Sequence, residues 1–190
     1  KYYHVFSQHP QSHLVSEELK LIDQVLTANI MWDEIVHIEY YTPDQNEYVY
    51  DLKTQTGNRV IQFLWATTGI ENIREYLNTK YDNWSFHGVK LHQCWENFSI
   101  DSNFFKEVAI WTEKHDLPLF IHLYSDREVL KLIEYKKKHP KLKLIVAHLF
   151  GLEVFIKNNF KDNNLYFDTS PLQLISDNRL KKAINYVGIE

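Results

Sequence analysis

Five residues that could bind a metal ion or move a proton stand at or near the ends of short apolar segments. They are Lys90, His92, His122, His148 and Asp168. Neutral imidazole binds zinc and similar divalent ions, and a catalytic zinc site has three protein ligands plus a position for water. The ion lowers the pKa of that water, and a nearby base can accept its proton. A single histidine at such a position can equally be a core imidazole, so the prediction depends on the grouping.

The segments that carry these residues alternate between strand-like and helix-like patterns. Short apolar runs rich in β-branched or aromatic residues predict strands at 34–40, 59–65, 86–92, 117–123, 142–148 and 164–168. Between them, apolar residues recur at three- and four-residue spacing, as on the buried face of a helix. Capping-box spacings predict helix starts at Thr68 and Ser125, and Ser16 and Asp177 are further candidate caps.

This alternation predicts an α/β fold in which helices cover a parallel sheet. The later strands are nearly continuous apolar runs, as burial on both faces requires. In such folds functional groups gather at the carboxyl ends of the strands. Because the candidates end four consecutive predicted strands, we expect them at one edge of the sheet. The pattern alone leaves an open sheet and part of a closed barrel as alternatives.

Four segments in order give a more specific pattern than any one of them alone. They read GVKLH at 88–92, LPLFIH at 117–122, HPKLKLIVAHLFG at 139–151 and NLYFDTS at 164–170. In this order they resemble the amidohydrolase superfamily, in the branch of aminocarboxymuconate-semialdehyde decarboxylase and related metal-dependent hydrolases. The resemblance covers about residues 16–185. It implies a (β/α)8 TIM-barrel-like fold in which these segments are strands four to seven.

The resemblance also implies a role for each candidate. His122 matches the metal-binding histidine of the fifth strand. His148 matches the sixth-strand histidine, which orients the attacking water and substrate or binds a second metal. Lys90 lies near the position of a metal-bridging carboxylated lysine in some members, with a substrate-facing or ion-paired lysine as the alternative. Asp168 is expected to contact substrate, and His92 either contacts substrate or is only a residue of the rim. The implied cofactor is a divalent metal ion, zinc with manganese as the alternative.

The chain departs from the family pattern at both ends. The first strand of the family ends in a His-x-His pair, whereas His4, His9 and His13 lie in a segment without strand character. The aspartate of the eighth strand would follow the last predicted helix. We therefore expect a single barrel domain over residues 1–190 that contains about strands two to seven and lacks the first and last. An excerpt of a longer chain explains this better than a truncated or partner-completed domain.

Composition excludes several classes of function. The 21 basic and 25 acidic residues give a net charge of −4, without the basic face that a nucleic-acid binder shows. No apolar run reaches the ~18 residues of a membrane span. A single cysteine, Cys94, excludes an internal disulfide and indicates a reducing compartment, hence a cytoplasmic location. Cys94 has no base nearby in the sequence that would make it a nucleophile, and Trp95 is a candidate wall of the site.

The sequence thus predicts a metal-dependent hydrolase of the amidohydrolase type. It would act on a small carboxylated or carbonyl-bearing molecule through metal-activated water. The alternatives are a non-oxidative decarboxylase of the same branch and a catalytically inactive barrel that binds a ligand or partner. The expected partner is a small-molecule substrate; nucleic acid and membrane partners are not expected, and a homo-oligomer is left open.

Overall fold

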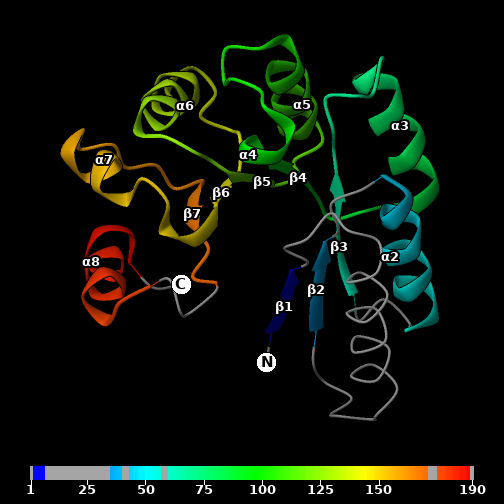
Figure 1. The fold of residues 1–190 in the computed structure, drawn as a ribbon, viewed down its shortest axis with the longest axis horizontal. Helices are drawn as coiled ribbons and strands as arrows, with labels where there is room; N and C mark the ends of the chain where they lie inside the picture. The colour runs from blue at the N-terminus through cyan, green and yellow to red at the C-terminus, as the bar shows by residue number, and fades with distance from the viewer. Residues whose placement is uncertain (1, 7–34, 40–42, 57–59, 171–174, 189–190) are drawn as a thin grey trace.

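The chain folds around a curved sheet of parallel strands (Figure 1). The computed structural model describes residues 2–6, 35–39, 43–56, 60–170 and 175–188. Within them seven strands lie in sequence order, and each pairs in parallel with the next. The strands are β1 Tyr2–Phe6, β2 Ile35–Glu39, β3 Val60–Trp65, β4 Gly88–His92, β5 Leu119–His122, β6 Leu144–Val146 and β7 Leu165–Phe167.

Helices lie around the outside of the curved sheet and connect its strands (Figure 1). They are α2 Pro43–Gln55, α3 Ile73–Trp84, α4 Gln93–Glu96, α5 Asn103–Lys114, α6 Asp126–Lys138, α7 Leu152–Lys157 and α8 Asp177–Val187, and the 3₁₀ turn η1 Ala147–Leu149 follows β6. Three serines, Ser102, Ser125 and Ser176, cap α5, α6 and α8 by accepting a hydrogen bond from the backbone N–H three residues on. No helix in the described ranges has the length and apolarity of a membrane span.

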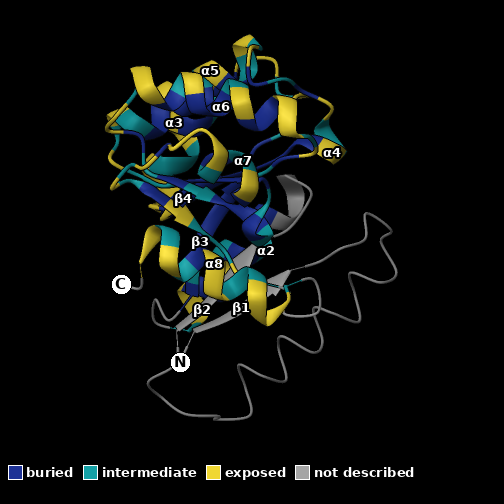
Figure 2. Cartoon of the chain, turned by 90° about the vertical axis from the view of Figure 1, so that its left-hand side faces the viewer, coloured by how far each residue is buried: buried dark blue, intermediate teal, exposed yellow. Residues whose placement is uncertain are grey.

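The two faces of the sheet bury different sets of side chains. Leu64 and Val89 belong to the large apolar core that the sheet shares with the helices. Phe63, Phe120 and Ile145 form a separate cluster, which we place inside the curve because side chains alternate along a strand. Figure 2 shows the central strands mostly buried and the helices exposed on their outward faces. Burial on both faces explains why the central strands are continuously apolar in sequence.

A glycine starts β4 because no side chain fits there. A Cβ atom on Gly88 would lie 2.3 Å from Cε1 of Phe63, far inside van der Waals contact. Phe63 is the register partner of Gly88, and its ring meets that of Phe120 edge-on at 6.1 Å. The inner face at this level is therefore filled by aromatic side chains from the neighbouring strands.

The predicted α/β, barrel-like fold class is confirmed, and all six predicted strands are present with shorter bounds. The structure adds β1, which pairs with β2 from Tyr2↔Ile35 to Phe6↔Glu39. The prediction that the segment around His4 lacks strand character is therefore wrong. Among the described strands it is the first in the sheet, and four of its five residues, Tyr2, Tyr3, Val5 and Phe6, are types that favour strands. The polar His4 interrupts this short run.

Two predicted helix starts are shifted. The cap of α3 is Asn72 and not Thr68, whose backbone N–H instead donates to Glu96 Oε2 at 3.0 Å. The cap of α8 is Ser176, one residue before the predicted Asp177. In both cases a competing polar side chain nearby takes the capping position. The helix α2 was not predicted, because its first turn is polar and it has no clear apolar stripe.

Some expectations concern residues whose structure is not described. The predicted helix that follows Ser16 and the histidines His9 and His13 lie outside the described residues. They remain sequence-based predictions.

Candidate active site

The inner face of the sheet carries the predicted site residues in two layers. In the deeper layer, Lys90 of β4 lies in register between Trp65 of β3 and Phe120 of β5. Lys90 is fully buried, and its Nζ is 3.6 Å from the centroid of the Phe120 ring. In the layer nearer the carboxyl ends, His92 is paired with His122. Because side chains alternate along a strand, Lys90 and His92 point to the same side of the sheet.

The rings of His92 and His122 stack face to face. Their centroids are 4.1 Å apart, and their planes differ by 4°. Trp95 also stacks on His92, with the centroids 4.2 Å apart. His92 is only 4% exposed, whereas His122 is partly exposed. The aromatic neighbours therefore fix the His92 ring more firmly than the His122 ring.

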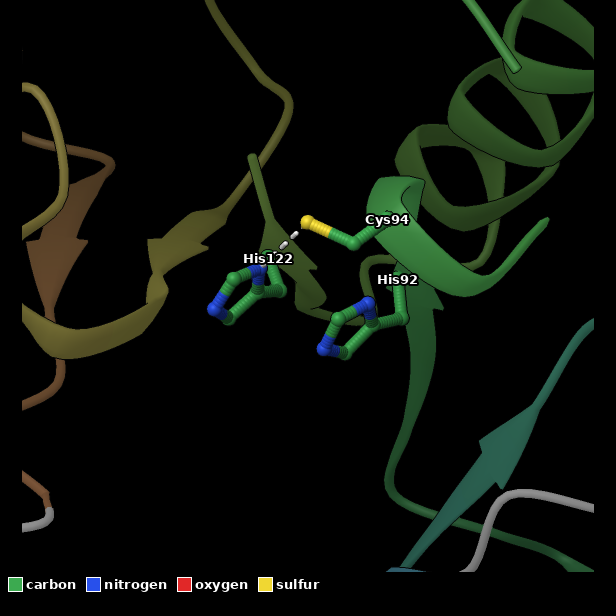
Figure 3. A group of neighbouring side chains, drawn as sticks. All are labelled: His92, Cys94 and His122. Atoms are coloured by element: carbon green, nitrogen blue, oxygen red, sulfur yellow. Dashed lines mark hydrogen bonds between the residues drawn. The ribbon is translucent and has the colours of Figure 1, made fainter. Parts of the chain in front are cut away.

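Cys94 brings a thiol to the same place. It lies in α4, the short helix that directly follows β4, and its side chain is exposed. Its Sγ is 3.9 Å from His122 Nδ1, and one donor atom each of His92, Cys94 and His122 lie within 4.8 Å of one another (Figure 3). Desolvation raises the pKa of the Cys94 thiol, although a backbone hydrogen bond partly opposes this. The protein alone therefore does not activate this thiol as a nucleophile.

Sequence reasoning did not place Cys94 in the site. His122, the imidazole that its thiol approaches, is 28 positions away in the sequence. The available signal was the spacing of His92 and Cys94, in which one residue separates two potential metal ligands. Only the pairing of β4 with β5 brings the second imidazole to this short segment.

His148 approaches the same group from β6. It lies in η1 with a left-handed backbone conformation, φ 56°, and its ring is 5.1 Å from that of His122, at 65°. Its Nδ1 donates to the backbone carbonyl of Ser170 and lies 3.2 Å from Oδ2 of Asp168. In the neutral ring with Nδ1 protonated, Nε2 carries the lone pair, as a general base requires.

Asp168 is held by its own set of hydrogen bonds. Ser170 donates its backbone N–H to Oδ1 at 3.1 Å and its Oγ–H to Oδ2 at 2.7 Å. The backbone N–H of His148 also donates to Oδ2, at 3.3 Å. A fixed carboxylate in this position selects the tautomer and the orientation of an imidazole. The structure therefore brings Asp168 to His148, and its predicted contact with substrate stays a prediction.

A buried carboxylate of α6 holds the segment that carries Cys94. Glu128 is 2% exposed and accepts hydrogen bonds from Gln93 Nε2 at 2.9 Å and from the backbone N–H of Ile100 at 2.7 Å. Its other oxygen is 2.7 Å from Lys131 Nζ. Burial by itself would raise the pKa of Glu128, but these hydrogen bonds, with that of Lys131 the strongest, lower the pKa below its ordinary value.

The structure thus brings four of the five predicted residues to one edge of the sheet. His92, His122, His148 and Asp168 lie at the carboxyl ends of β4 to β7, and Lys90 lies one layer deeper. Their individual roles stay predictions. A cavity of about 760 Å³ lies elsewhere, between β7 and α8, and none of these five residues lines it.

Comparisons with known proteins identify the fold. No protein-family model matches the sequence, and no curated protein matches it. Solved structures do match. One is a Staphylococcus aureus protein provisionally described as an amidohydrolase, which superposes with a TM-score of 0.70 at 15% sequence identity. The match covers 99% of this chain and 83% of that one. The chain has the same fold as that protein.

Two decarboxylases with this fold are also similar. The 5-carboxyvanillate decarboxylase LigW of Sphingomonas paucimobilis gives a TM-score of 0.62 at 14% identity, over 97% of this chain and 75% of that one. The 5-carboxyvanillate decarboxylase LigW2 of Novosphingobium aromaticivorans, with bound manganese, gives 0.65 at 12% identity, over 95% and 73%. The resemblance to the amidohydrolase superfamily is thus confirmed at the level of the fold.

Proposed function

We propose that this amidohydrolase-fold chain is a metal-dependent hydrolase that acts on a small carboxylated or carbonyl-bearing molecule. The observation that carries the proposal is the convergence of His122 and His148, whose rings lie 5.1 Å apart at the carboxyl ends of neighbouring strands. This is the edge at which enzymes with parallel β/α barrels place their catalytic groups. The amidohydrolase fold of the chain supports the same reading.

The side chains around His122 fit a divalent metal ion. Two imidazoles and a thiol place their donor atoms within 4.8 Å of one another, and these are donor types that zinc prefers. His122 is the residue that we propose to hold the ion. When bound, the ion would lower the pKa of a water molecule towards neutrality. Zinc is the first candidate; manganese is the alternative, because one decarboxylase with this fold contains it.

We propose His148 as the catalytic residue beside the ion. Its Nε2 would accept a proton from water, while the backbone carbonyl of Ser170 and the carboxylate of Asp168 hold the proton on Nδ1. Lys90 and His92 are proposed to face the substrate, Lys90 through the attraction of its charge for a substrate carboxylate. The substrate is expected to enter from the edge formed by the carboxyl ends of β4 to β7.

Non-oxidative decarboxylation is the second candidate reaction. Two of the similar structures are decarboxylases of an aromatic carboxylic acid, and the same residues would bind a carboxylated substrate. Analysis of the products distinguishes the two reactions, since only decarboxylation releases CO₂. A cytoplasmic location and a homo-oligomer stay predictions.

Metal content and turnover of three variants test the proposal. We expect the purified protein to contain one zinc or manganese per chain and His122→Ala to lose most of it. His148→Asn should keep the metal but lose most turnover on a panel of small carboxylated amides, lactones and aromatic acids. The control is His87→Asn, because His87 precedes β4 at the opposite end of the strand. Equal metal content in His122→Ala and the parent protein would remove His122 from the site, and unchanged turnover in His148→Asn would reject the role of His148.

A further inference from the structure

Three potential metal ligands meet where β4 and β5 end. His92 is the last residue of β4, Cys94 lies in the helical turn that follows, and His122 is the last residue of β5 (Figure 3). The strand register places the two histidines opposite each other. The sequence separates the cysteine from His92 by one residue only. Two of the three ligands therefore come from one short segment and the third from the neighbouring strand.

We propose that His92, Cys94 and His122 are the protein ligands of a zinc ion and that the Cys94 thiolate makes the site selective for zinc over manganese. The inference rests on the proposed function through His122, adds Cys94 and His92 as ligands, and gives His92 this role in place of a substrate contact. Thiolate and imidazole suit zinc, whereas manganese prefers carboxylate, carbonyl and water oxygen. Three protein ligands leave one position of a tetrahedral zinc for water or substrate.

The distances between the donor atoms are close to those of a zinc site. With Zn–S near 2.3 Å and Zn–N near 2.0 Å, tetrahedral ligands lie about 3.3–3.5 Å apart. The 3.9 Å between Cys94 Sγ and His122 Nδ1 exceeds this by a few tenths of an ångström. The largest separation in the group, up to 4.8 Å, must shorten by up to about 1.5 Å. Side-chain rotations supply such a movement without a change in the backbone.

The stacked rings determine which side chain has to move. An imidazole binds a metal in the plane of its ring, and the planes of His92 and His122 are parallel to within 4°. One of the two rings must therefore turn when both bind the same ion. His92 is buried and stacked on Trp95, while His122 is partly exposed. We assign the rotation to His122 and the fixed position to His92.

The hydrogen bonds of Gln93 fix the backbone between two of the ligands. Gln93 is 1% exposed, and its Nε2 donates to Glu128 Oε2 at 2.9 Å and to the backbone carbonyl of Phe98 at 3.1 Å. Because Gln93 separates His92 from Cys94, this anchoring limits the distance over which the two ligands can drift apart. A site whose ligands are already positioned binds an ion at a lower cost in conformational entropy.

Titration of the metal-free protein with Co²⁺ tests the assignment directly. A thiolate ligand gives cobalt an intense charge-transfer absorption in the near ultraviolet, which histidine and carboxylate ligands do not give. We expect this band at one Co²⁺ per chain, its displacement by Zn²⁺ and its loss in Cys94→Ser. A wild-type protein that binds Co²⁺ without the band would overturn the role of Cys94.

Calorimetric titrations give the affinities. Loss of an outer partner of a metal ligand already costs about 10–100-fold, so Cys94→Ser and His92→Asn should each weaken Zn²⁺ binding by at least about 100-fold. The affinity for Mn²⁺ should change far less in Cys94→Ser, so the preference for zinc shrinks. His87→Asn is the matched control and should bind Zn²⁺ as the parent protein does. Unchanged Zn²⁺ affinity in Cys94→Ser or in His92→Asn refutes that residue as a ligand.

Alkylation of the wild-type thiol provides a readout that needs no variant. Cys94 is the single cysteine of the chain, so iodoacetamide labelling reports on this residue alone. We expect Zn²⁺ to slow the labelling strongly and Mn²⁺ to leave it nearly unchanged; equal rates with and without Zn²⁺ contradict the proposal.

The outcomes also separate this inference from the proposed function. If Zn²⁺ binding depends on His122 but not on Cys94 or His92, the three-ligand site fails and the hydrolase proposal stands. If the cobalt band and the zinc affinities are as expected but no compound of the panel is turned over, the site stands and the proposed function fails.

Discussion

Replacing Glu128 by glutamine tests whether one buried carboxylate positions the segment that carries Cys94. Glutamine has nearly the same shape but lacks the negative charge, and it keeps a single carbonyl oxygen. In the native protein one carboxylate oxygen accepts from both Gln93 Nε2 and the backbone N–H of Ile100, and the other lies 2.7 Å from Lys131 Nζ. The variant should therefore loosen the chain between β4 and α5.

The magnitude follows from the hydrogen bonds that are lost. A hydrogen bond to a charged group contributes about 1.5–3 kcal/mol. The glutamine oxygen can keep both N–H donors, but its NH₂ group then faces Lys131 Nζ and cannot accept from it. We therefore expect Glu128→Gln to lower the free energy of unfolding by about 2–3 kcal/mol. For a domain of this size each kcal/mol corresponds to about 2–4 °C, so the melting temperature should fall by about 4–12 °C.

The pH dependence of stability distinguishes a charged role from simple packing. The pKa of Glu128 is lowered in the folded protein, so its contribution is present above its ordinary value of 4.5 and is lost as the pH falls through the lowered value. The difference in melting temperature between parent and variant should therefore be largest near neutral pH and shrink below pH 4.5.

Thermal unfolding followed by circular dichroism at several pH values measures this difference. Glu134→Gln is the matched control, because Glu134 is an exposed carboxylate of the same helix that pairs with Lys137. Its melting temperature should stay close to that of the parent protein. A Glu128→Gln variant that melts with the parent protein at pH 7, or a difference that does not change with pH, would show that the reasoning is wrong.

Two further substitutions test the inner face and the imidazole at β6. Gly88→Ala should destabilise the fold by about 1–3 kcal/mol in urea unfolding, because the new Cβ would meet the Phe63 ring at 2.3 Å. The control is Gly69→Ala, whose Cβ would have its nearest neighbour at 3.9 Å and which should have little effect on stability. Asp168→Asn should keep the metal content but reduce turnover by about 10–100-fold and change its pH profile, because His148 loses the carboxylate that orients it. A pH profile identical to that of the parent protein would separate Asp168 from the reaction.

Local sequence patterns predicted the elements whose signals lie within a few residues. Apolar runs identified the central strands, and Ser125 was correctly predicted to cap α6 because its spacing to Glu128 is local. Prediction failed where a strand pattern was interrupted or where two nearby polar residues could both cap a helix. The segment of β1 is rich in aromatic and β-branched residues but short and interrupted by His4. At α3 the side chain of Asn72 took the position expected for Thr68.

The sequence also determined which residue types end each strand, and therefore that imidazoles would gather at one edge of the sheet. Alternation along β4 alone places Lys90 and His92 on one face. What the sequence could not determine is the depth and distance of each group. The burial of Lys90 against Phe120, the 4.1 Å stack of His92 on His122 and the approach of Cys94 to His122 all depend on the pairing of β4 with β5.

The orientation of the catalytic candidate was likewise decided by tertiary structure. The sequence places His148 just after an apolar run. The left-handed turn at φ 56°, the hydrogen bond of Nδ1 to Ser170 and the nearby carboxylate of Asp168 set the direction of its ring. These contacts join residues about 20 positions apart. Residue type and period are local properties of a chain, whereas the distance between two side chains on different strands exists only once the strands have paired.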